Sequence, residues 1–243
     1  MDILIGDNLE IISHEAARLF MSLSRRYTRL SGRFVVAVSG GRTPERLYRI
    51  LSSDSYRKSI AWGKVHMFWV DERFVPCDHP DNNFRLIRRT LLKRLALPWG
   101  NLHPITTDHV SACASAKRYD ADVRHFFSHT TTTSFPRFDL IILGIGADGH
   151  TASLFPGSKR LNEEEHIAVP VKNGKTRNPR ITLTLPVLNN ARHVLFLVSG
   201  KRKAPAVRKV IIERDRAAPA SLVNPHDGKC HYYIDRDAAT AIR

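Results

Sequence analysis

The segment LGIGADGHTASLFPG, residues 143–157, contains the pair of side chains best suited to proton transfer. Asp148 stands two residues before His150, and a neighbouring carboxylate can orient an imidazole as a general base. The same segment has the spacing G-x-G-x-x-G, beginning at Gly144, which is typical of a turn that binds a dinucleotide. The residues therefore suggest two kinds of site, a catalytic loop and a cofactor loop.

A dinucleotide-binding turn has two further requirements that this sequence does not meet. A long helix must follow the third glycine, and an acidic residue must stand at the end of the next strand. Phe155-Pro156-Gly157 interrupts any such helix, and the acidic run at 163–165 precedes the next strand candidate. The cofactor interpretation is therefore disfavoured. A lone histidine is more often structural than catalytic, so the catalytic interpretation depends on the other loops.

The sequence SGGRTP offers a phosphate-binding turn. Gly40 and Gly41 let the backbone approach a ligand closely, and the free N–H groups and dipole of a following helix favour a phosphate. Arg42 and Thr43 add a positive charge and a hydroxyl. An ordinary glycine turn is the alternative. A second alternative is the A-x-S-x-G elbow of serine hydrolases, but the Thr-Pro pair predicts a helix that begins too late for an elbow.

Other charged residues stand beside apolar segments. The run D-E-R after VHMFWV contains Asp71, which can fix a neighbour, and Arg73, which can stabilise developing negative charge. A salt-bridged strand end is the alternative. Arg180 begins RITLTL and Lys203 lies in SGKRKA; an arginine grips a phosphate with two donors, whereas a lysine acts as a mobile point charge. For either one alone, a solvated surface charge is the alternative.

Helix and strand candidates alternate along the chain and place these residues at the ends of strands. The strand candidates are residues 33–38, 65–70, 138–144, 166–171, 180–185, 193–198 and 231–234. The helix candidates are residues 9–30, 43–51, 82–95, 107–127 and 201–215. This order predicts a Rossmann-like α/β fold, an open and mainly parallel sheet with helices on both faces. Ligands of such folds bind outside the carboxyl ends of the strands. Four loops follow strand candidates there: SGGRTP, DERFVP, GIGADGH and SGKRK. We therefore expect these four loops to converge on one site.

Length and composition are those of a globular protein. The chain has 243 residues, of which 42% are hydrophobic and 25% charged, and we expect residues 1–243 to form a single domain. The three cysteines are far apart and no Cys/His cluster has the spacing of metal ligands, so neither disulfides nor a metal site is expected.

The charge balance leaves the class of partner open. There are 38 basic and 23 acidic residues, a formal net charge of +15, which suits an anionic substrate, a nucleic acid or an acidic membrane surface. The basic residues are scattered and no aromatic-interleaved motif accompanies them, so nucleic-acid binding is disfavoured. No apolar run is long enough to span a membrane, and the start MDILIGDNLE lacks the basic residues of a signal peptide. We therefore expect a cytoplasmic protein.

Taken together, the motifs resemble those of the 6-phosphogluconolactonases. The matching blocks are VAVSGGRTPERLY, FWVDERFVPCDHPDNN, FDLIILGIGADGHTASLFPGS, RITLTLPVLNNA, FLVSGKRKA and PASLV. They cover essentially the whole chain, and DGHTASLFPG is the most specific. Glucosamine-6-phosphate deaminases look similar at the S-G-G and D-G-H loops, but Arg73 and residues 151–157 favour the lactonase. Asn82 departs from the serine common there, whereas Asn83 fits.

The resemblance implies a phosphosugar isomerase/deaminase-like fold, no cofactor, and hydrolysis of 6-phosphoglucono-δ-lactone to 6-phosphogluconate. The residues expected in catalysis are His150, Asp148 and Arg73, and those expected to bind substrate or its phosphate are Gly40, Gly41, Arg42, Thr43, Asp71, Asn83, Arg180 and Lys203. A sugar-phosphate deaminase or isomerase is the nearest alternative. A nucleic-acid-binding protein that uses the positive charge on the same scaffold is a remote one.

Overall fold

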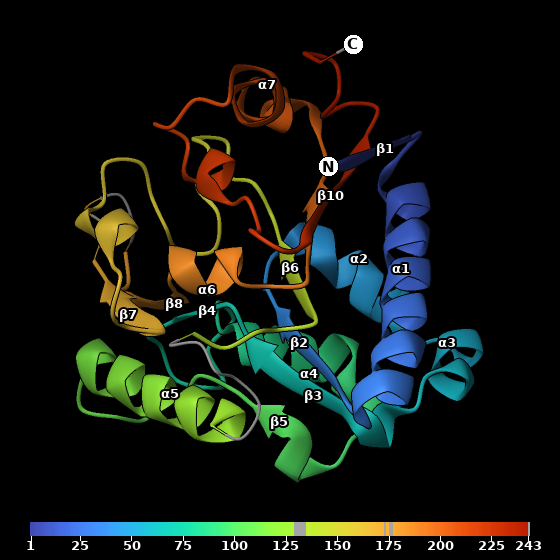
Figure 1. Ribbon diagram of the computed structural model, residues 1–243, viewed down its shortest axis with the longest axis vertical. Coiled ribbons are helices and arrows are strands. Elements are labelled where there is room, and N and C mark those ends of the chain that lie inside the picture. The colour runs from blue at the N-terminus through green and yellow to red at the C-terminus, as the bar shows by residue number, and fades with distance from the viewer. Residues whose placement is uncertain (129–134, 173, 175–176, 243) are drawn as a thin grey trace.

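A parallel β-sheet forms the centre of the computed structural model, which describes residues 1–128, 135–172, 174 and 177–242 (Figure 1). In spatial order, the strands described in it are β1 (Asp2–Gly6), β10 (Lys229–Asp235), β9 (His193–Val198), β6 (Leu140–Leu143), β2 (Phe34–Val38), β3 (Val65–Trp69) and β5 (Leu102–His103). Every neighbouring pair of these strands runs parallel. β2 and β9 are buried along their whole length, as expected of strands covered on both faces.

Helices cover both faces of this sheet. The described helices are α1 (Leu9–Ser31), α2 (Arg42–Leu51), α3 (Asp54–Ser59), α4 (Asn83–Thr90), α5 (Ala112–Phe127), α6 (Leu185–Asn189) and α7 (Ala204–Arg208). Phe34 of β2 packs against Phe20 of α1, whereas Phe68 of β3 packs against Phe126 of α5. Phe68 lies in register with Ala37, three residues from Phe34, and so points to the opposite face. The predicted fold class is confirmed.

Two strand candidates belong to a second, smaller sheet. β7 (Ala168–Val171) and β8 (Arg180–Leu183) pair antiparallel, and β8 also pairs antiparallel with β4 (Asp71–Arg73). The eight residues between β7 and β8 are too few for the crossover that a parallel pair requires. α5 packs against this sheet (Figure 1). The sequence predicted the two strands but not their separate sheet.

Several predicted boundaries were wrong for local reasons. α5 begins at Ala112 and not at 107, because Ser111 caps it by accepting a hydrogen bond from the backbone N–H of Ala114. The helix expected over 82–95 is α4 followed by a 3-10 turn at Leu92–Arg94. The helix expected over 201–215 consists of a 3-10 turn, α7 and a π-helical turn that ends at Glu213.

Candidate active site

The four loops meet at one cavity of about 400 Å³ outside the carboxyl ends of the parallel strands. Among the residues that line it are ten of the eleven expected site residues: Gly40, Gly41, Arg42, Thr43, Asp71, Arg73, Asn83, His150, Arg180 and Lys203. Asp148 does not line the cavity but contacts His150 from behind. The structure therefore brings the expected residues together, although it does not assign their roles.

Asp148 and His150 form a close pair. Nδ1 of His150 lies 2.5 Å from Oδ1 of Asp148, and the backbone N–H of His150 also donates to that oxygen at 3.2 Å. The neighbouring imidazole and these hydrogen bonds hold the pKa of Asp148 below its usual value, although its partial burial opposes the shift. An ionised Asp148 accepts a hydrogen bond from Nδ1–H, which leaves Nε2 of His150 as the proton acceptor.

The glycine-rich loop makes this pair possible. A Cβ on Gly146 would lie 2.1 Å from Nδ1 of His150 and 2.6 Å from Oδ1 of Asp148. The loop closes on itself through the backbone N–H of Gly146, which donates to the carbonyl of His150 at 2.7 Å. Thr151 adds a hydrogen bond from its hydroxyl to the carbonyl of Gly144 at 2.9 Å. The middle glycine provides space for the Asp–His pair, and no long helix follows the third.

The N-terminus of α2 opens onto the same cavity. α2 begins at Arg42, one residue before the predicted range 43–51, with Gly41 as its N-cap at a φ of 107°. Glycine adopts that conformation without steric cost, which lets the helix begin directly after the turn. No side chain caps this helix, so its first N–H groups are available to an anion.

Ser39 does not have the geometry of an activated nucleophile. α2 begins three residues after Ser39 and not directly at it, so the delay that argued against an elbow is present. The side chain adds to this argument: Ser39 is 6% exposed, and its hydroxyl donates to the carbonyl of Ile142 at 2.7 Å. Within the described part of the chain, no hydrogen bond joins Ser39 to a histidine.

Asp71 and Arg180 lie together on the smaller sheet. Nη1 of Arg180 is 3.9 Å from Oδ2 of Asp71, and the hydroxyl of Ser153 donates to the same carboxylate oxygen at 2.6 Å. Burial lowers the pKa of Arg180, and Asp71 opposes that shift, so the carboxylate supports the charged guanidinium. Ser153 is fully buried. It was not among the expected site residues, because a buried hydroxyl leaves no recognisable motif in the sequence.

Glu72 connects Arg73 to Asn83. Its side chain is fully buried, and it accepts hydrogen bonds from the backbone N–H groups of Arg73, Asn83 and Phe84 at 2.7–2.9 Å. Burial raises the pKa of Glu72 to about 7, although these hydrogen bonds oppose the shift. Glu72 was also missed as a site residue. Its place in the charged run between Asp71 and Arg73 was the available signal.

Asn83 and Arg73 are held by neighbouring backbone groups. Nδ2 of Asn83 donates to the carbonyl of Asp71 at 2.9 Å, and Nη1 of Arg73 donates to the carbonyl of Asp81 at 2.6 Å. Nε of Arg73 is buried and has no partner among the described residues. Because Arg73 is in register with Arg180 across the β4–β8 pair, two guanidinium-bearing residues lie side by side along the cavity.

Lys203 completes the positive lining. Its pKa is lowered by partial burial and by Arg42, whereas Asp148 raises it. Asp235 fixes the loop that precedes this lysine, because its carboxylate accepts the backbone N–H of Gly200 at 3.0 Å. The cavity is therefore lined by four cationic side chains, Arg42, Arg73, Arg180 and Lys203, together with His150, which pairs with Asp148. Such an arrangement suits an anionic substrate that undergoes proton transfer.

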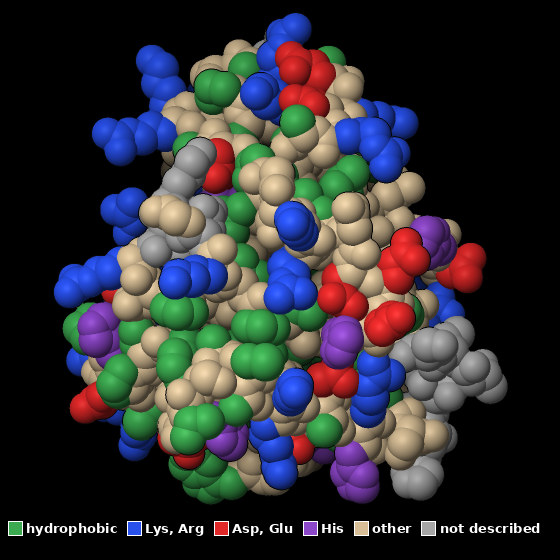
Figure 2. All heavy atoms as spheres, turned by 90° about the vertical axis from the view of Figure 1, so that its left-hand side faces the viewer, with side chains coloured by type: hydrophobic (Ala, Val, Ile, Leu, Met, Phe, Trp, Pro, Cys, Tyr) green, Lys and Arg blue, Asp and Glu red, His purple; other side chains and the backbone are tan. Residues whose placement is uncertain are grey.

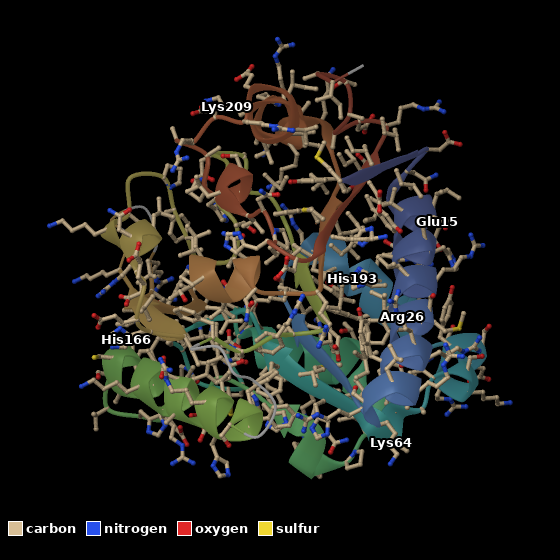
Figure 3. The ribbon with its side chains drawn as sticks, in the orientation of Figure 1. Glu15, Arg26, Lys64, His166, His193 and Lys209 are labelled. Atoms are coloured by element: carbon tan, nitrogen blue, oxygen red, sulfur yellow. The ribbon has the colours of Figure 1, made fainter. Side chains whose placement is uncertain are left out.

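The remaining positive charge is dispersed over the surface. Figure 2 shows Lys and Arg side chains spread over one face of the molecule, among Asp, Glu and His, without a continuous basic strip. Lys64 and Lys209 lie near opposite ends of the long axis (Figure 3). Among the described residues, no group of three or more His, Cys, Asp or Glu side chains could hold a metal ion. No helix in the described part of the chain is long and apolar enough to cross a membrane.

The fold and the site define an α/β enzyme with an anion-binding cavity and an Asp–His pair at the carboxyl edge of a parallel sheet. The chain belongs to the glucosamine-6-phosphate isomerases/6-phosphogluconolactonase family, whose model matches residues 7–232. Two curated relatives are both called 6-phosphogluconolactonase. The relative from Synechocystis sp. is 36% identical over 100% of this chain and 98% of its own length, and that from Nostoc sp. is 35% identical over 96% and 98%.

Solved structures agree with this assignment. The crystal structure of 6-phosphogluconolactonase from Leishmania guyanensis has a TM-score of 0.88 and is 27% identical, covering 100% of this chain and 98% of that one. The agreement extends over both sheets, because the match includes every part of the chain.

Proposed function

We propose that this protein hydrolyses 6-phosphoglucono-δ-lactone to 6-phosphogluconate, a reaction of the oxidative pentose phosphate pathway. The names and the end-to-end similarity of its relatives support the proposal. The observation that carries it is the Asp148–His150 pair beside a cavity that Arg42, Arg180 and Lys203 also line. The substrate has a phosphate at one end and an ester carbonyl at the other, so its site needs an anion-binding surface and a base.

The cationic part of the cavity is proposed to hold the phosphate. The uncapped N-terminus of α2 presents Gly41, Arg42 and Thr43 to the cavity, where backbone N–H groups and the helix dipole favour an anion. Arg180 and Lys203 add positive charge from the smaller sheet and from the loop after β9. Binding the phosphate there fixes the lactone relative to His150, and such positioning lowers the barrier to reaction.

His150 is proposed to act first as a base and then as an acid. Nε2 takes a proton from water while the water oxygen attacks the C1 carbonyl, and Asp148 stabilises the imidazolium that forms. The imidazolium then gives its proton to the ring oxygen as the C1–O bond breaks. The resulting acid loses a proton to solvent and leaves as the carboxylate. Each turnover consumes one water and regenerates neutral His150.

Arg73 is proposed to stabilise the oxyanion of the tetrahedral intermediate. Arg73 lines the cavity, and the hydrogen bond from its Nη1 to the carbonyl of Asp81 fixes the guanidinium there. A charged donor aimed at the developing charge lowers the barrier without reorganising during the reaction. Because a δ-lactone is already reactive, a base and one such donor are sufficient machinery.

The proposed function is tested with purified protein and freshly generated 6-phosphoglucono-δ-lactone. Ring opening, followed as acid release, should proceed far faster than in a buffer blank at the same pH. A parallel incubation with glucosamine 6-phosphate, followed as ammonia release, tests the deaminase alternative. Lactone hydrolysis no faster than the blank would refute the proposal, and ammonia release would favour the alternative.

Four further expectations remain part of the proposal. We propose that residues 1–243 form one domain, that the reaction needs no cofactor, that the protein works in the cytoplasm and that nucleic acid is not its partner. Catalytic silence together with tight, steeply salt-dependent binding of an oligonucleotide would contradict the last of these.

A further inference from the structure

Phe155 contacts two residues of the site without lining the cavity itself. Its ring centroid lies 4.8 Å from that of His150, with 46° between the ring planes. The guanidinium carbon of Arg180 lies 5.7 Å from the same centroid, within the range of a cation–π interaction. Phe155 is not among the residues that line the substrate cavity but lines a second cavity. One ring therefore contacts both the proposed base and a proposed phosphate ligand without lining the substrate cavity.

The smaller sheet and a tight turn hold this ring in place. Phe155 is 6% exposed and forms an apolar cluster with Val169 and Val171 of β7, apart from the main core. The turn after it closes through the backbone N–H of Ser158, which donates to the carbonyl of Phe155 at 3.1 Å. The position of the ring is thus set by β7 and by the loop that carries His150.

We infer that Phe155 is a positioning residue that couples the orientation of His150 to that of Arg180. This inference rests on the proposed function. Arg180 lies near the carboxylate of Asp71 and the face of Phe155, so losing the ring removes one of these two contacts. His150 is held by Asp148 at Nδ1 and by the ring at its side, so losing the ring frees the imidazole to rotate.

The ring also acts on charge. Each proposed turnover converts His150 to an imidazolium, and the face of an aromatic ring attracts a cation. Phe155 therefore stabilises the intermediate in which His150 is protonated as well as the guanidinium of Arg180. An aliphatic side chain of similar size fills the space but lacks this attraction. Full activity therefore requires the aromatic character of the side chain at 155, and not its volume alone.

The test compares Phe155→Leu and Phe155→Tyr with wild type and with a control, Phe138→Leu. Phe138 is a fully buried phenylalanine two residues before β6 that packs against Phe68 and Phe127, so its replacement has a similar packing cost outside the site. Steady-state kcat and KM for the lactone are measured against pH, with the buffer blank subtracted, and thermal unfolding is recorded for each variant.

Phe155→Leu should lower kcat by about tenfold or more and raise KM by about threefold or more, because both His150 and Arg180 lose a support. Its pH profile of kcat/KM should differ from that of wild type, since the proposed imidazolium loses the attraction of the ring. Phe155→Tyr should retain most of the wild-type kcat and the wild-type pH profile. Phe138→Leu should lower the unfolding temperature but keep both constants within about twofold.

Two results would overturn the inference. One is a Phe155→Leu enzyme that is only less stable, with kcat, KM and the pH profile of wild type, and the other is a Phe155→Tyr enzyme as impaired as Phe155→Leu. Failure of the proposed function shows separately, as an inactive wild type. In that case calorimetric binding of inorganic phosphate, which needs no turnover, decides: Phe155→Leu should bind it more weakly than wild type, and equal affinity would overturn the inference.

Discussion

Replacing Gly146 with alanine should disable the proposed base while leaving the fold intact. The added Cβ would lie 2.1 Å from Nδ1 and 2.3 Å from Cε1 of His150, and 2.6 Å from Oδ1 of Asp148. Non-bonded atoms of this kind normally stand about 3.5 Å apart, so the imidazole must move by roughly 1.4 Å. A misplacement of about 1 Å at a catalytic group can cost about 10²-fold in rate. We therefore expect kcat for the lactone to fall by about two orders of magnitude.

The matched control is Gly144→Ala in the same loop. A Cβ at Gly144 would meet nothing within 4 Å, and neither Gly144 nor Gly146 has a positive φ. Both substitutions therefore carry the same small backbone effect, but only one displaces the Asp–His pair. Initial rates of lactone hydrolysis and thermal unfolding are compared for the two variants. Gly144→Ala should keep nearly the wild-type kcat, and both variants should unfold within a few degrees of wild type, since a side chain can swing aside at little cost in stability.

Equal activity in Gly146→Ala and Gly144→Ala would refute this reasoning. It would mean that the contact between Asp148 and His150 does not limit the reaction. A Gly146→Ala protein that fails to fold would also contradict the reasoning, because both variants are expected to unfold within a few degrees of wild type.

Other properties of the structure lead to four further predictions. Arg180→Ala and Lys203→Ala should each raise KM for the lactone by about tenfold or more, because each removes a charge-assisted contact to the phosphate; unchanged KM in both would exclude them from that role. With 38 basic and 23 acidic residues, kcat/KM should fall as salt is raised from about 10 to 200 mM, and a flat response would exclude electrostatic steering. Ser39→Ala should keep kcat within a few-fold, because its hydroxyl donates to Ile142. His193 lies beside α1 (Figure 3), and burial lowers its pKa to about 4. The contribution of neutral His193 to stability is therefore complete above pH 6.5 and is lost as pH falls towards 4. The free energy of unfolding of His193→Asn, measured in urea, should depend less on pH over that range than that of wild type.

The sequence predicted the parallel sheet because its strands are buried on both faces. Segments such as FVVAV of β2 and HVLFLV of β9 are short, continuous, apolar and rich in valine, and that pattern is typical of strands covered by helices. Once those strands were placed, the convergence of the four loops followed from the rule that parallel strands end at one edge. Ten of the eleven expected residues accordingly line one cavity.

The smaller sheet was not predictable in the same way. Its strand β4 has three residues, which is too short for a periodic pattern to identify. β5 of the larger sheet has two residues and was missed for the same reason. β1 was missed as well, because half-exposed Ile3 and Ile5 give it the mixed pattern of an edge strand. Whether β7 and β8 join the larger sheet depends on the length of their connection and on their partners, and not on their own composition.

The residues that support the site left weak signals for a related reason. Ser153 contacts Asp71 across 82 positions, and Phe155 packs against Val169 and Val171 of β7. Neither spacing nor residue type predicts a contact of that kind.

The rate of lactone hydrolysis by His150→Ala, measured beside wild type on freshly generated substrate, tests the proposed mechanism most directly. Loss of a general base should lower kcat by about 10²–10⁴-fold, while unfolding and the binding of inorganic phosphate stay close to wild type, because His150 is a partly exposed side chain at the cavity surface. Wild-type kcat in His150→Ala would contradict the mechanism and would require a different group to activate the water.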